Sequence, residues 1–86
     1  ILHPELYKRL VAWRNAEASR LGLPVYTVIQ QKAILGITNL LPEDKTTLLR
    51  IPYFGKKGVE KYGDELLEMV RMYKKESGIA ETLFSD

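Results

Sequence analysis

Apolar residues recur every three or four positions along most of this chain, and this spacing constrains the fold more than any other feature. The first long segment carries Leu6, Leu10 and Trp13 at such intervals, and the pattern returns from Gln31. Side chains three and four residues apart share one face of an α-helix, whereas strands alternate every two residues. Residues 25–29 could be read as a strand, but no second strand pattern exists to pair with it. The sequence therefore predicts an all-α domain.

Proline and glycine mark the ends of the first elements. Pro4 can occupy the first turn of a helix whose apolar positions extend to Leu21. Gly22 and Pro24 should end this helix, because glycine caps helix C-termini and a residue before proline avoids the helical region. Residues 25–29 are then expected to form a turn or a short helix.

The middle of the chain predicts two further helices. The helix that carries the second apolar stripe should close at Pro42. Asp44 can cap a short helix over residues 45–50, because its carboxylate can accept a hydrogen bond from a free backbone amide. Leu48 and Leu49 are expected to face inward from this helix.

The C-terminal part is expected to contain a turn and two helices. Residues 52–55 form the turn, and residues 56–62 make about two helical turns that stop at Gly63. Asp64 and Glu65 should open the last helix, where negative charge is favourable. The buried stripe of that helix is expected to consist of Leu66, Met69, Val70 and Tyr73.

The length and composition indicate a single globular domain. A chain of 86 residues has room for one modest core, and 45% hydrophobic with 28% charged residues is the usual composition of such a domain. We expect one compact bundle of about five helices over residues 1–76 and a tail or linker over residues 77–86. Because the chain opens at Ile1 without a methionine, we expect it to be a piece of a larger protein.

The sequence offers few residues for catalysis or metal binding. It has no cysteine, and its single histidine, His3, stands next to the beginning of the chain. Residues 55–58 contain glycines and lysines, but not in the order of a phosphate-binding P-loop. The acidic pairs at 43–44 and 64–65 stand where helices should begin, so capping explains them better than acid–base chemistry. We expect neither catalysis nor a cofactor.

Basic and acidic residues are segregated along the chain, although the net charge is only +2. Residues 1–32 and residues 50–61 each carry a net charge of +3, and residues 62–86 carry −3. The second basic stretch includes a turn followed by a helix start, where unpaired amides and the helix dipole favour an anion. A solvated lysine face without a ligand is an equally good interpretation.

The second basic stretch also carries the most informative motif, Leu48-Leu49-Arg50-Ile51-Pro52-Tyr53-Phe54-Gly55-Lys56-Lys57-Gly58-Val59-Glu60-Lys61-Tyr62-Gly63. This motif resembles the C-terminal half of the HRDC domain, the helicase and RNase D C-terminal module of RecQ-type helicases. The segment Leu23-Pro24-Val25-Tyr26-Thr27-Val28-Ile29 looks like the proline-led connector of that family. The likeness covers roughly residues 5–75. It implies a non-catalytic accessory domain of an ATP-dependent DNA helicase in DNA repair and recombination, which binds single-stranded or branched DNA weakly.

The resemblance also implies a role for Tyr26, because the matching tyrosine contacts single-stranded DNA in some RecQ relatives. An exposed ring can stack on any base, while packing at the edge of the core is an equally good interpretation. Tyr53 stands where the family usually has the first glycine of a Gly-x-Gly turn, which bears on how closely backbone can approach phosphate. The basic residues expected to contact phosphate are Arg20, Lys32, Arg50, Lys56, Lys57 and Lys61.

Two other functions stay open at this point. The domain could dock onto proteins, including the helicase core of its own chain, or it could bind RNA as part of an RNase D-like exonuclease. All three alternatives place a monomer without membrane contact inside the cell, in the bacterial cytoplasm with the nucleoid or in the nucleus. The DNA-binding interpretation requires residues 55–61 and the Tyr26 turn to lie side by side on one cationic face.

Overall fold

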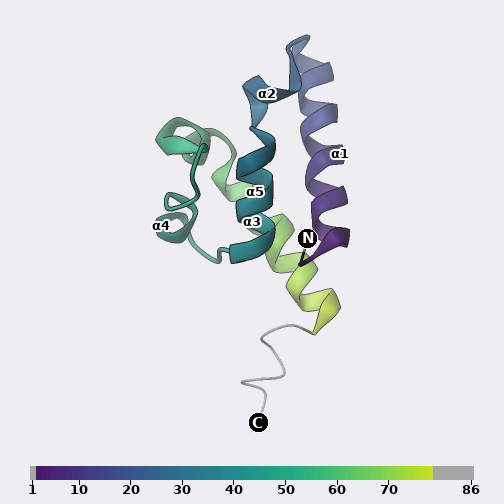
Figure 1. Ribbon diagram of the computed structural model, residues 1–86, viewed down its shortest axis with the longest axis vertical. Coiled ribbons are helices and arrows are strands. Elements are labelled where there is room, and N and C mark those ends of the chain that lie inside the picture. The colour runs from purple at the N-terminus through teal and green to yellow at the C-terminus, as the bar shows by residue number, and fades with distance from the viewer. Residues whose placement is uncertain (1, 79–86) are drawn as a thin grey trace.

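The computed structural model describes residues 2–78, and within them the chain is all-α without a strand. The expected tail over residues 77–86 therefore lies outside the described residues except for its first two positions. The elements in chain order are α1 (Pro4–Leu21), α2 (Val25–Val28), α3 (Gln31–Leu40), α4 (Lys45–Leu48) and α5 (Gly55–Ser77) (Figure 1). The predicted fold class is confirmed. No helix among the described residues combines the length and apolar character needed to cross a membrane.

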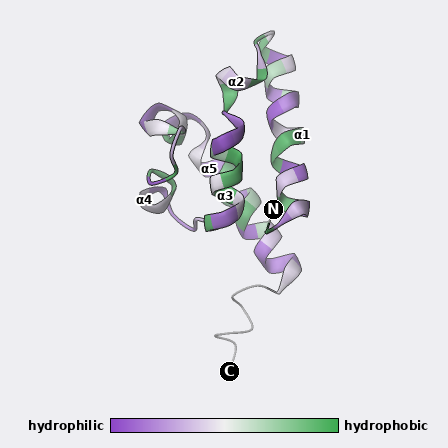
Figure 2. Ribbon diagram, in the orientation of Figure 1, coloured by the Kyte–Doolittle hydropathy of each residue, from purple (hydrophilic) through white to green (hydrophobic). Residues whose placement is uncertain are grey.

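The helices enclose one core. The long helix α1 packs against α2, α3 and α5, and α4 packs against α5 (Figure 1). Apolar and polar residues alternate around the helices in Figure 2, as expected for helices with one buried face. Every helix contributes to the core, whose fully or nearly fully buried residues include Leu6, Leu10, Val28, Ile34, Ile37, Leu48, Leu66 and Val70.

The predicted ends of α1 and the short helix α2 are confirmed. Pro4 begins α1, and Gly22 adopts a left-handed conformation with φ of 69°. The Gly22 amide donates to the Ser19 carbonyl at 3.2 Å and the Leu23 amide donates to the Ala18 carbonyl at 3.0 Å. These two bonds satisfy carbonyls that the end of the helix would otherwise leave unpaired.

The short helix α4 is capped as predicted but ends two residues earlier than expected. The Asp44 carboxylate accepts a hydrogen bond from the Thr47 amide at 2.8 Å, and this bond lowers the pKa of Asp44. Leu48 is fully buried, as expected, whereas Leu49 is 48% exposed. The prediction that Leu49 faces inward is therefore wrong, because the chain leaves the helix after Leu48.

The largest correction concerns Gly63, which does not end a helix. The single helix α5 continues through it, so Asp64 and Glu65 lie within a helix and not at its start. A Cβ at Gly63 would lie 3.3 Å from Val59 Cγ1 and 3.6 Å from Leu48 Cδ2. Gly63 thus lies in van der Waals contact with α4, while the tightest neighbour of such a Cβ is Val59 on α5 itself. An uninterrupted helix also keeps the apolar stripe on both sides of Gly63 in one line.

Candidate nucleic-acid interface

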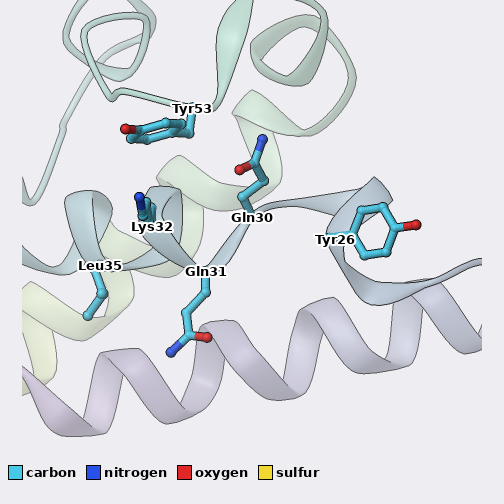
Figure 3. Close-up of a pocket in the computed structure, with 6 residues that line it drawn as sticks. All are labelled: Tyr26, Gln30, Gln31, Lys32, Leu35 and Tyr53. Carbon is cyan, nitrogen blue, oxygen red and sulfur yellow. The ribbon is translucent and has the colours of Figure 1, made fainter.

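An open hollow lies where α2, the start of α3 and the turn before α5 meet. Its volume is about 490 Å³. Figure 3 shows Tyr26 and Tyr53 on two sides of the hollow, with Gln30 between them. The residues that line it are Tyr26, Gln30, Gln31, Lys32, Leu35 and Tyr53.

Tyr26 presents its ring to solvent from α2. Pro24 precedes this helix with an extended backbone, and the Thr27 hydroxyl donates to the Pro24 carbonyl at 2.6 Å. Val28 on the same helix is buried, while Tyr26 is 67% exposed. Of the two interpretations of Tyr26, the structure thus favours an exposed ring over one packed against the core.

Lys32 and Tyr53 form a cation–π pair at the hollow. The Lys32 Nζ lies 5.0 Å from the centroid of the Tyr53 ring and points at its face (Figure 3). Tyr53 has a φ of 70°, in the left-handed region that favours glycine. Tyr53 thus has a backbone conformation that favours glycine, at the position where the resemblance to the family predicts a glycine. Tyr53 was not among the expected site residues, and the aromatic side chain at a glycine position was the signal that could have found it.

Lys56 and Lys57 follow the Tyr53 turn at the start of α5. Both are exposed, and neither forms an ion pair among the described residues. Lys61, one turn further along, is also exposed, and its Nζ lies 5.3 Å from the centroid of the Tyr62 ring. None of these lysines lines the hollow, but Lys56 and Lys57 are close in sequence to Tyr53, which does.

The N-terminal half of α5 is held against α1 by aromatic contacts and a hydrogen bond. The rings of Trp13 and Tyr62 meet edge to face, with centroids 5.0 Å apart. The Tyr62 hydroxyl donates to the Glu17 carboxylate at 2.9 Å. Burial and this hydrogen bond raise the pKa of Tyr62. Tyr62 thus joins α5 to α1.

Arg20 is already paired within the protein. Its guanidinium donates to both carboxylate oxygens of Glu17, at 2.9 and 2.6 Å. This contact lowers the pKa of Glu17 and raises that of Arg20.

Arg50 is exposed in the turn after α4 and has no ion pair among the described residues. The structure thus brings Tyr26 and Lys32 together at the hollow, while Arg20 and Arg50 lie outside its lining.

The chain is thus a small all-α domain in which two exposed tyrosines and a lysine without an ion pair among the described residues line one hollow. The family model described as the HRDC domain matches residues 3–70, and the chain therefore belongs to the HRDC domain family. The predicted family is confirmed.

The chain is similar in sequence to part of two DNA helicases. The chain is 36% identical over 67 residues to the ATP-dependent DNA helicase UvrD2 of Mycobacterium bovis and to that of Mycobacterium tuberculosis. The match covers 78% of this chain but only 10% of each relative's length. No solved structure gives a significant match. A RecQ-type parent stays a prediction.

Proposed function

We propose that the chain is a non-catalytic accessory domain of an ATP-dependent DNA helicase and that it binds single-stranded or branched DNA weakly. The observation that carries this proposal is that one hollow is lined both by the exposed Tyr26 and by Lys32, whose ammonium has no ion pair among the described residues. The relatives, named as DNA helicases, support the nature of the parent protein. In this proposal the domain is a monomer that holds DNA near the helicase core of its own chain, in the nucleoid or the nucleus.

The proposed interface binds DNA in two ways, by stacking of a base on an aromatic ring and by electrostatic attraction of the phosphates. A base stacks on Tyr26 without sequence readout, because every base has an aromatic face. Lys32, Lys56 and Lys57 attract the phosphates, and their contacts release counterions, so affinity falls as salt rises. Lys61 and Arg50 are exposed and add to this attraction at the margin of the interface. Arg20 contributes least, because it would have to exchange the carboxylate of Glu17 for a phosphate.

Replacing Tyr26 with alanine is expected to weaken binding of a fluorescent oligothymidylate about five- to tenfold, at the lower end of base-stacking energies. Fluorescence anisotropy at low and moderate salt measures this change. Since Tyr26 is exposed, its loss should leave the melting temperature nearly unchanged. A large loss of stability with unchanged affinity would instead show that the ring serves the core.

The same titration with a matched oligouridylate separates the alternative ligands. Tighter binding of RNA than of DNA would favour an RNase D-like parent. Absence of binding to both strands at low salt would contradict the proposal and favour a docking module.

Removing the charge of Lys56 or Lys57 is expected to lower the slope of log affinity against log salt by about one unit for each lysine. Binding titrations of each alanine variant over a range of salt concentrations provide the slopes. Lys75→Ala is the matched control, since Lys75 is an exposed lysine in the last turn of the same helix. Equal slopes for the Lys56→Ala variant, the Lys75→Ala variant and the unsubstituted chain would remove Lys56 from the interface.

A further inference from the structure

The side chain of Tyr53 occupies a position that its backbone does not favour. Its φ of 70° lies where bulky residues are uncommon, and the ring is nevertheless 58% exposed. Burial of the ring therefore does not explain why a tyrosine stands there. The ring instead meets the ammonium of Lys32, whose Nζ lies 5.0 Å from the ring centroid.

The contact with a ring leaves the charge of Lys32 available. Arg20, by comparison, is held by the carboxylate of Glu17, which neutralises it. An aromatic ring attracts a cation through its electron-rich face but carries no net charge. The side chains that line the hollow with Lys32 are two tyrosines, two glutamines and Leu35, none of them acidic. Lys32 is thus both held in place and free to attract an anion.

Lys32 and Tyr26 line the same hollow, whose volume of about 490 Å³ leaves room for the sugar and phosphate of a nucleotide whose base stacks on Tyr26. Gln30 lies between the two tyrosines and carries an amide that can bond the edge of a base (Figure 3). The face of Tyr53 towards Lys32 is covered by the ammonium, so that face cannot also stack on a base.

We propose that Tyr53 is a positioning residue: its ring holds the Lys32 ammonium in the hollow, where it meets the phosphate of the nucleotide whose base stacks on Tyr26. This inference rests on the proposed function. It assigns the phosphate contact to Lys32 on α3 and a supporting role to Tyr53, which stands in the turn where the family pattern has its first glycine.

The test is a double-mutant cycle on binding of the fluorescent oligothymidylate. Tyr53→Leu is expected to weaken binding about two- to fivefold, the usual strength of an exposed cation–π contact. Tyr53→Phe keeps the ring and should bind like the unsubstituted chain. Leucine and phenylalanine are both disfavoured at a positive φ. The difference in affinity between the two variants therefore reports the loss of the aromatic ring. In a Lys32→Met background, Tyr53→Leu should have no further effect, and the salt slope should already be lower by about one unit.

Each result has a distinct meaning. Absence of binding by the unsubstituted chain overturns the proposed function together with this inference. If the unsubstituted chain binds and loses affinity on Tyr26→Ala, but Tyr53→Leu binds equally well, the inference alone is wrong. A further loss caused by Tyr53→Leu in the Lys32→Met background would show that the ring touches DNA directly, and would also overturn the positioning role.

Proton NMR of the unsubstituted chain provides a second measurement that needs no variant to fold. The ε-methylene protons of Lys32 should resonate upfield of an ordinary lysine because the adjacent Nζ lies over the Tyr53 ring. They should shift again when thymidine 5′-monophosphate is added. Ordinary lysine positions in the free chain would contradict the proposed contact.

Discussion

Replacing Leu48 with alanine is expected to lower the free energy of unfolding by about 2–5 kcal/mol, the usual cost of emptying a buried leucine site. Leu48 is fully buried, although it belongs to the short helix α4. It packs close to Gly63 in the middle of α5, so the cavity would open between the two helices. Urea unfolding followed by far-ultraviolet circular dichroism measures the loss.

The adjacent leucine is the control for this prediction. Leu49 is 48% exposed, and its replacement by alanine should change the free energy of unfolding by no more than about 0.5 kcal/mol. The two variants remove the same atoms from neighbouring positions. Equal losses would mean that both side chains are buried, as the sequence alone suggested.

The failure to separate these two leucines from sequence has a physical reason. Helical periodicity identifies a buried face only when it repeats over several turns, as it does in α1 and α5. The helix α4 ends after Leu48, so its pattern does not repeat. By contrast, Gly22 and Asp44 were predicted correctly, because a cap depends on local backbone bonds and not on distant packing.

Gly63 illustrates a different limit. Glycine ends helices, but it also lets two helices approach closely, and a single sequence does not distinguish these uses. At Gly22 the backbone has a positive φ, whereas Gly63 continues a helix and lies against α4. Whether Gly63 ends a helix or lies inside one depends on where α4 packs, and this packing is a tertiary contact.

The candidate site was predicted in part. Tyr26 and Lys32 were both singled out from the sequence and both line the hollow, whereas Lys56, Lys57 and Lys61 do not line it and their contacts with phosphate stay a prediction. The role that we propose for Tyr53 could be inferred only from the structure, because the start of α3 and the turn that carries Tyr53 are far apart in the chain. The pairing of Arg20 with Glu17 could have been found from spacing, since residues three apart on a helix are neighbours.

Replacing Gly58 with alanine is expected to destabilise the domain by about 1–3 kcal/mol, the usual cost of overpacking. The same change in an ordinary helix would stabilise it by roughly 0.5–1 kcal/mol. The cause is the Phe54 ring, since a Cβ at Gly58 would lie 2.6 Å from Phe54 Cε1 and 2.9 Å from Phe54 Cδ1. The ring packs against the core and would have to leave its place. Thermal and urea unfolding provide the measurement.

The double variant determines whether Phe54 is the cause. In a Phe54→Ala background the obstacle is gone, so Gly58→Ala should now stabilise the domain, and its effect changes sign. A loss of similar size in both backgrounds would assign the destabilisation to another contact.

Because Phe54 lies between Tyr53 and the lysines at the start of α5, its displacement should also disturb the proposed interface. Gly58→Ala alone is therefore expected to weaken binding of the oligothymidylate under conditions where the domain is still folded, and the double variant, which lacks the displaced ring, should bind more tightly than Gly58→Ala does.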